Sequence, residues 1–263
     1  PWKFEGWASM NSRANQRRGS SPDRPVALVV GASGGIGAPV ASMLASEGYS
    51  LTVAGRNAES LAGLQKCLSS TAVRVETAVV DLLEPESAER IVTSHLSTFG
   101  RLDLLVMASG TTRREALADA RVESSRRVIE VNFTAVLATL RAALPALREA
   151  GRQHGSALVV LLGSIVARQP AAEFGVYSAT KAAVASLARS VNEEEGCNGV
   201  RATTLAPGFV DTEMACPIRD MSGEDLLPVG DLVEGVRFLL RLSSLARVEE
   251  LEIGRICVSG RAP

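Results

Sequence analysis

The chain has 263 residues, of which 46% are hydrophobic and only 4% aromatic, and its formal net charge is −1 at pH 7. A charge this close to zero creates no overall field that would attract nucleic acid or a membrane surface, so we expect neither as a partner. The longest apolar run, about 157–167, is shorter than the roughly 20 residues that cross a bilayer.

Cysteine and histidine are scattered along the chain. The four cysteines show no C-x-x-C spacing and lie apart from both histidines, which argues against a metal site or a disulfide framework. We therefore expect no bound metal, and reduced thiols in a cytoplasmic protein. His95, in a helical segment, and His154, in a polar turn, are predicted to be solvated.

Residues 1–24 differ in composition from the rest. They contain both tryptophans and an excess of basic residues over acidic ones, with frequent serine, asparagine and glycine. We interpret this segment as a flexible basic tail. The remnant of an organelle-targeting signal is the alternative, so targeting is not excluded.

From residue 25 onward, short apolar runs alternate with segments of helical periodicity. The predicted strands are Val26–Val30, Ser50–Ala54, Arg74–Val80, Leu102–Ala108, Ala157–Leu162, Arg201–Ala206 and Glu252–Val258. The predicted helices are Gly35–Glu47, Ala58–Leu68, Pro85–Thr98, Ser124–Ala150, Val176–Glu195 and Leu232–Leu242. This alternation predicts one α/β domain over 25–263, a Rossmann-type doubly wound parallel sheet of about seven strands with helices on both faces.

Two details of this pattern carry expectations of their own. Pro145 should kink the long helix or mark its last turns. Residues 211–230 contain two prolines and two glycines and lack strand periodicity, so we expect a lid over a ligand.

A glycine-rich turn connects the first strand to the first helix. It reads Gly31-Ala32-Ser33-Gly34-Gly35-Ile36-Gly37. Glycines there permit a tight turn and close approach of a pyrophosphate, which the N–H groups at a helix N-terminus would bind. The spacing is G-x-x-x-G-x-G rather than the common G-x-G-x-x-G, and a glycine-rich loop without a ligand is the alternative.

Tyr177 and Lys181 stand four residues apart in a predicted helix, with Ser164 upstream. At this spacing both side chains share one helix face. A free phenol titrates near pH ~10, and a nearby positive charge would bring its proton transfer into a useful range. We therefore expect Tyr177 to act as an acid or base with a pKa lowered by Lys181.

Together these motifs resemble the classical short-chain dehydrogenase/reductase family over about Val26–Val258. Besides the glycine turn and the Ser-Tyr-Lys set, the positions that correspond to family motifs are Asp81, Leu82, Ala108, Ser109, Gly110, Asn132, Pro207, Gly208, Val210 and Thr212. Met107 and Ser109 depart from the family's usual Asn-Asn-Ala-Gly, and the chain lacks the common Asp-Gly-Gly ending. The C-terminal part looks more like NADP-dependent 3-hydroxy acid dehydrogenases and related carbonyl reductases.

The resemblance implies a role for each matched residue. Tyr177 would exchange a proton with the substrate oxygen, and Ser164 would orient that oxygen. Lys181 would hold the nicotinamide ribose, and Asn132 would hold a water that links Lys181 to solvent. Asp81 and Leu82 would contact the adenine, and Thr212 would reach the nicotinamide carboxamide. The remaining matched residues would bind the dinucleotide.

Arg56, after the second strand, bears on the choice of cofactor. An acidic residue there would bind the ribose hydroxyls of NAD(H), whereas a guanidinium suits the 2′-phosphate of NADP(H). We therefore favour NADP(H) over NAD(H). The alternative is that Arg56 stacks on the adenine or faces water.

The substrate is expected to be a small-molecule carbonyl or alcohol, with a ketone or 3-oxo group reduced to a secondary alcohol. The candidate pocket residues are mostly apolar: Ile165, Val166, Phe174, Phe209 and Met214. Arg113 and Arg114 would meet a substrate carboxylate or form a solvated loop. The alternatives are a 3-oxoacyl-thioester reductase of fatty-acid or polyketide type and a non-catalytic NADP(H)-binding regulator. Family members are usually homotetramers or homodimers, and we expect the same here.

Overall fold

The computed structural model describes residues 24–214 and 226–256. Nearly all of the expected tail, the middle of the expected lid, Cys216, Cys257 and Val258 lie outside these ranges. The described residues form one sheet of seven parallel strands in the order β3-β2-β1-β4-β5-β6-β7. The strands are β1 Val26–Val30, β2 Ser50–Gly55, β3 Val75–Val79, β4 Leu104–Met107, β5 Ala157–Leu162, β6 Val200–Pro207 and β7 Glu250–Ile253. The predicted Rossmann-type fold is confirmed, and the last strand starts two residues earlier than predicted.

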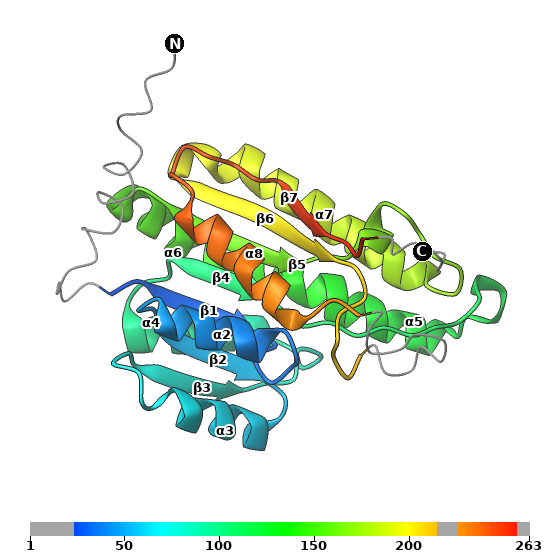
Figure 1. Ribbon diagram of the computed structural model, residues 1–263, viewed down its shortest axis with the longest axis horizontal. Coiled ribbons are helices and arrows are strands. Elements are labelled where there is room, and N and C mark those ends of the chain that lie inside the picture. The colour runs from blue at the N-terminus through cyan, green and yellow to red at the C-terminus, as the bar shows by residue number, and fades with distance from the viewer. Residues whose placement is uncertain (1–23, 215–225, 257–263) are drawn as a thin grey trace, which may run out of the picture.

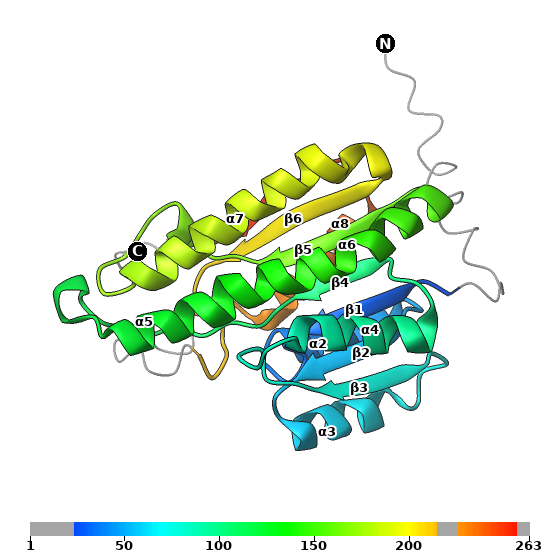
Figure 2. The ribbon, with the colours of Figure 1, turned by 180° about the vertical axis from the view of Figure 1, so that it is seen from behind.

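Helices cover both faces of the sheet (Figure 1). One face carries α2 Gly37–Ser46, α3 Ala58–Leu68 and α8 Val229–Arg241. The other carries α4 Ser87–Phe99, α6 Ala135–His154 and α7 Gly175–Glu195, which lie in front of the sheet in Figure 2. The strands contribute alternate residues to two separate hydrophobic clusters, one under each helix layer. Central strands such as β1 are therefore buried along their whole length.

The long helix predicted over 124–150 has two parts. α5 Val122–Ile129 passes into a π-helical turn, η2 Glu130–Thr134, before α6 begins. Pro145 lies inside α6, which continues to His154, so Pro145 does not mark the last turns. The continuous helix 122–154 passes the length and composition test for a membrane span. A core helix passes the same test, and Leu140 and Leu147 of this one are buried against the sheet.

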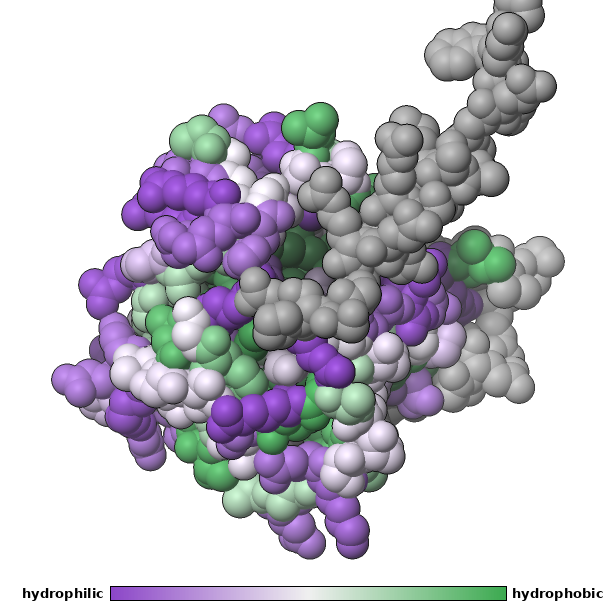
Figure 3. Space-filling model, turned by 90° about the vertical axis from the view of Figure 1, so that its left-hand side faces the viewer, coloured by the Kyte–Doolittle hydropathy of each residue, from purple (hydrophilic) through white to green (hydrophobic). Residues whose placement is uncertain are grey.

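Short 3₁₀ turns complete the chain: η1 Leu117–Asp119, η3 Ile165–Ala167 and η4 Gly196–Asn198. All strands run in one direction, so their first residues share one end of the molecule. Figure 3 shows that end, where polar and apolar residues are interspersed on the surface. The predicted site residues follow the strands and lie at the opposite end.

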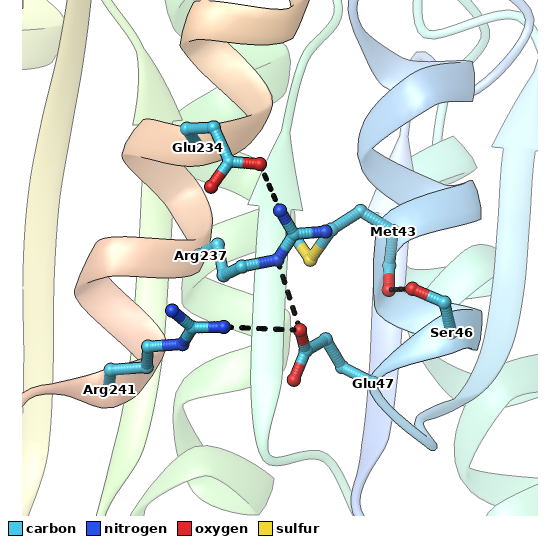
Figure 4. A network of polar contacts seen from close by, with 6 residues as sticks. All are labelled: Met43, Ser46, Glu47, Glu234, Arg237 and Arg241. Carbon is cyan, nitrogen blue, oxygen red and sulfur yellow. Dashed lines mark hydrogen bonds and ion pairs between the residues drawn. The ribbon is translucent and has the colours of Figure 1, made fainter.

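Helices α2 and α8 are joined by an ion-pair network around Glu47 (Figure 4). The Arg237 guanidinium lies between the carboxylates of Glu47 and Glu234, with Nε 3.0 Å from Glu47 Oε1. Arg241 approaches the same Glu47 oxygen at 4.0 Å. These contacts fix α8, which follows the expected lid, against the helix that follows the glycine turn.

Gly31 gives the chain its sharp exit from β1. Its φ is +87°, and a Cβ added there would lie 2.4 Å from the main-chain nitrogen of Ser109. A side chain would meet both a backbone penalty and a steric clash. Glycine is therefore required where the segments that follow β1 and β4 touch.

His95 is buried, contrary to the expectation that it is solvated. Only 1% of its surface is exposed, Nδ1 lies 2.8 Å from Thr52 Oγ1, and Nε2 lies 3.0 Å from the carbonyl oxygen of Arg101. A carbonyl only accepts, so Nε2 carries the proton and Nδ1 accepts from Thr52. The spacing Ala88, Ile91, Val92, His95 is the buried stripe of an amphipathic helix, and that pattern was the available signal. His154 is exposed, as expected.

Burial lowers the pKa of His95 from 6.5 to about 4, although a hydrogen bond to Arg101 and the charge of Asp103 oppose the shift. The unfolded chain therefore binds the extra proton first, and stability falls as pH drops from about 6.5 towards 4. We expect urea unfolding to show a loss of about 2 kcal/mol between pH 7.5 and pH 5 from this group. His95→Gln should remove this part of the pH dependence, whereas His154→Gln should keep it. An unchanged pH dependence in His95→Gln would contradict the assignment.

Gly31→Ala and Gly48→Ala separate backbone strain from crowding. Both glycines have positive φ, +87° and +90°, but a Cβ on Gly48 would meet nothing within 4 Å. Gly48→Ala should cost about 1–2 kcal/mol of unfolding free energy, from the left-handed backbone alone. Gly31→Ala should cost clearly more, measured by the same urea titration. Equal costs would mean that the contact with Ser109 is unimportant.

Candidate active site

The predicted functional side chains gather beyond the carboxyl ends of β1, β4, β5 and β6. The glycine turn follows β1, the segment 108–112 follows β4, Ser164 follows β5, and Gly208 follows β6. In a parallel sheet these ends share one edge, which is where such folds bind ligands. Residues that are far apart in the sequence therefore gather at one edge of the sheet, and we call this edge the cleft because such folds bind ligands there.

Asn132 is fully buried in the π-helical turn. Its amide pairs with the main chain of Thr111 in both directions, with Oδ1 accepting from N–H and Nδ2 donating to the carbonyl, each at 2.8 Å. Nδ2 also lies 3.2 Å from Thr180 Oγ1. The side chain thus joins the segment after β4 to helix α7.

Tyr177 lies between Ser164 and Lys181. A hydrogen bond between the side chains of Ser164 and Tyr177 lowers the pKa of the phenol. The Lys181 ammonium lies 5.6 Å from the centre of the Tyr177 ring and donates to the carbonyl oxygen of Leu162 at 2.6 Å. Ser164 is itself held at the end of β5, where its hydroxyl lies 3.4 Å from the carbonyl oxygen of Pro207. The three predicted catalytic side chains are therefore in one place.

The pKa values of this group differ from the sequence expectation. Burial raises the pKa of Tyr177 to about 12, and the hydrogen bond with Ser164 only partly offsets this. Burial also lowers the pKa of Lys181 to about 8. The pKa of Tyr177 is therefore raised overall, contrary to the expectation that it is lowered, because loss of water penalises the charged form of each group. Tyr177 is a protonated donor at neutral pH.

The glycine turn fits a phosphate group. Gly34 and Gly35 are exposed, and helix α2 starts without a side-chain cap or an acidic residue in its first turn. Within α2, the N–H groups of Ala38 and Val40 donate to the carbonyl oxygens of Gly34 and Ile36, and Pro39 has no N–H, so an anion would be met by the N–H groups where the turn enters the helix. A Cβ on Gly35 would lie 2.8 Å from Thr212 Cγ2, so Thr212 lies directly against the turn. The segment after β6 closes the cleft from this side.

Arg56 and Ser33 lie together at the end of β2. A Cβ on Gly55 would lie 2.6 Å from Ser33 Oγ, so this glycine lets the serine approach β2. Arg56 follows Gly55 directly and is exposed to solvent. A hydroxyl and a guanidinium are suitable ligands for a phosphate ester.

The other predicted cofactor residues surround the same cleft. Asp81 accepts a hydrogen bond from the N–H of Leu83 at 3.0 Å, within the turn that follows β3. Gly110 lies beside Asn132 and Lys181, since a Cβ there would be 3.6 Å from both Oδ1 and Nζ. The remaining predicted residues are Ile36, Gly37, Leu82, Ala108, Ser109, Pro207, Gly208 and Val210, which lie in the turns just described or beside them.

Several contacts in the cleft were not predicted. Thr111, Thr180 and the carbonyl of Leu162 hold Asn132 and Lys181 in place. Nothing in the sequence marks them, because main-chain partners and a threonine in a helix have no pattern of their own. Among the expected apolar pocket residues, Ile165 lies beside Gly208, where a Cβ would be 3.6 Å from its Cδ1, and Phe174 packs against Tyr177.

Arg113 and Arg114 do not face the cleft as free cations. Arg113 Nε lies 3.6 Å from a carboxylate oxygen of Glu115, and Arg114 pairs with Glu173. Both guanidinium groups are therefore engaged by carboxylates of the protein. This arrangement favours the loop interpretation over a role in binding a substrate carboxylate.

Comparison with known proteins agrees with this geometry. The model of the short chain dehydrogenase family matches residues 25–223. An uncharacterized oxidoreductase of Staphylococcus saprophyticus is 31% identical over 229 residues, which are 87% of this chain and 96% of that protein.

Solved structures give the same result. The alcohol dehydrogenase of the archaeon Thermococcus sibiricus, complexed with 5-hydroxy-NADP, has a TM-score of 0.80 at 32% identity, with 88% of this chain and 96% of that chain covered. The actinorhodin polyketide ketoreductase with NADPH has a TM-score of 0.79 at 25% identity, with coverages of 89% and 97%. With the family model matching most of its length, this chain belongs to the short-chain dehydrogenase/reductase family of oxidoreductases.

Proposed function

We propose that this protein is an NADP(H)-dependent oxidoreductase that interconverts a ketone or 3-oxo compound and a secondary alcohol, with Tyr177 as the acid or base. One observation carries the proposal: Tyr177 lies between Ser164 and Lys181 at the carboxyl end of β5, in the cleft that the glycine turn borders. The alcohol dehydrogenase and the ketoreductase named above, each solved with a form of NADP, support the same chemistry.

The chain's own residues would hold the dinucleotide along the cleft. The N–H groups of the glycine turn and α2 would bind its pyrophosphate. Ser33 and Arg56 would bind the 2′-phosphate, and Lys181 would bind the nicotinamide ribose. When bound, the cofactor supplies or accepts the hydride.

In the reduction direction Tyr177 donates a proton to the substrate oxygen. Its raised pKa keeps the phenol protonated at neutral pH, so the donor form is the resting form. Ser164 hydrogen-bonds the same oxygen and fixes its position relative to the phenol. Lys181, with a pKa of about 8, is mostly charged at pH 7, and its charge favours the phenolate that remains.

Tyr177→Phe should lower kcat by at least about 100-fold, because the ring stays and only the proton donor is lost. The affinity for NADPH, measured by fluorescence titration, should stay unchanged. Tyr49→Phe is the matched control, since the chain has only two tyrosines and Tyr49 lies at the far end of α2. The assay uses a panel of ketones, 3-oxo esters and 3-oxoacyl thioesters. NADPH binding without turnover of any of them would favour the regulator, and turnover of thioesters alone would favour the 3-oxoacyl-thioester reductase.

Arg56→Ala should weaken NADPH binding by about tenfold or more, as expected for the loss of a charged hydrogen bond of about 1.5–3 kcal/mol. Binding of NADH, which has no 2′-phosphate, should not change. Arg74→Ala is the control, because Arg74 precedes β3 and lies at the opposite end of the sheet. An equal loss for both cofactors would assign Arg56 to the adenine instead.

A further inference from the structure

Two loops meet at the start of the helix that carries Tyr177. One is the segment 111–121, which follows β4, and the other is the segment 168–174, which precedes α7. The N–H of Glu115 donates to the carbonyl oxygen of Glu173 at 2.8 Å. Arg114 forms an ion pair with the Glu173 carboxylate. Leu117 packs so closely over Gly175 that a Cβ there would lie 2.7 Å from Leu117 Cδ2.

Glu173 adopts a backbone conformation that an acidic residue seldom occupies. Its φ is +66°, in the left-handed region. Such a conformation persists only where surrounding contacts hold it, and it is common near functional sites. Here both the carbonyl and the carboxylate of Glu173 are held by the loop after β4. The contacts of Glu115 and Arg114 therefore maintain the turn into α7.

The residue after this turn touches the catalytic phenol. Phe174 caps α7, and its carbonyl accepts from the N–H of Ser178 at 2.7 Å. Its ring meets the Tyr177 ring edge to face, with centroids 6.3 Å apart and an interplanar angle of 64°. This is a favourable aromatic geometry that fixes the orientation of both rings. The position of Phe174 depends in turn on the conformation of Glu173.

The nearby carboxylate of Glu115 has partners other than Arg114, so it does not compete with Glu173 for the Arg114 guanidinium. Glu115 is engaged by Arg113, by the N–H of Arg121 and by Ser124 Oγ. The side chains of Arg114 and Glu173 remain 52% and 42% exposed. An ion pair this exposed contributes little to global stability. Its effect is expected on local geometry rather than on folding.

We propose that Arg114 and Glu173 are positioning residues: their ion pair, the loop latch, holds Phe174 against Tyr177 and so sets the place of the proton donor in the cleft. The inference rests on the proposed function for the role of Tyr177 as proton donor. The effect of the ion pair on the position of the Tyr177 ring can be tested without any substrate. It also gives Arg114 a role other than binding a substrate carboxylate.

The structural test uses protein labelled with ¹³C at the tyrosine ring. Only Tyr49 and Tyr177 give signals, and Tyr49→Phe assigns them. Arg114→Ala and Glu173→Gln should each shift the Tyr177 resonance and leave Tyr49 in place. Arg113→Ala, which removes the adjacent arginine but not the loop latch, should leave both resonances unchanged. A Tyr177 resonance that is identical in Arg114→Ala and the wild type would overturn the proposal.

The kinetic test separates positioning from substrate contact. Arg114→Ala should lower kcat about tenfold, within the range known for small misplacements of catalytic groups. KM for the carbonyl substrate and the Kd of NADPH should not change. Arg114→Lys, and the exchange Arg114→Glu with Glu173→Arg, should restore most of kcat. A raised KM with unchanged kcat would instead mean that Arg114 binds substrate.

The two tests fail in different ways. If the wild type turns over no carbonyl compound, the proposed function fails while the tyrosine resonances still report on the loop latch. If Arg114→Ala unfolds the protein, Glu173→Gln removes the charge with little change of shape and decides the question. A loss of kcat in Arg113→Ala equal to that in Arg114→Ala would also contradict a specific role for the ion pair.

Discussion

The main chain of Gly31 lies against the main chain of Ser109, and the cleft is built outward from this contact. β1 and β4 are neighbours in the sheet although a long stretch of chain separates them. The glycine turn leaves on one side of the contact and the segment that pairs with Asn132 leaves on the other. Because only glycine permits both the positive φ and the close approach, backbone geometry sets how the glycine turn lies against the segment that follows β4. Side chains then refine this arrangement.

Burial changes the pKa values of the site residues more strongly than their hydrogen bonds and neighbouring charges do. Tyr177 and Lys181 are shifted in opposite directions, each towards its neutral form, as expected for groups that have lost water. The pKa of His95, which lies in α4 and is not one of the predicted site residues, is also shifted towards the neutral form by burial. A perturbed pKa therefore does not by itself identify a functional residue. What distinguishes Tyr177 is its place beside Ser164 at a strand end.

Periodicity predicted the parallel sheet of about seven strands and both helix layers, and motif order predicted the group Ser164, Tyr177 and Lys181. These features depend on local patterns that a sequence carries directly. The burial of His95 was not predicted. A histidine is polar and is expected at the surface, although its spacing in the helix places it in the buried apolar stripe. The partners of Arg114 and Asn132 depend on which loops meet in space. Long-range contacts between irregular segments leave no periodic signal in the chain.

The π-helical turn that carries Asn132 has a consequence for how this helix can be changed. Its N–H to carbonyl bond from Ala135 to Glu130 spans five residues, so the turn contains one residue more than a regular α-helix would need. Each residue turns a helix by about 100° around its axis. Removal of one residue from the turn would therefore restore regular α-helical winding and rotate α5 by about that angle relative to α6. Asn132 would then leave Thr111, and α5 would present a different side to its surroundings. A deletion that makes this helix regular would therefore break the contact between Asn132 and Thr111. Insertions and deletions in the π-helical turn should be much less tolerated than substitutions.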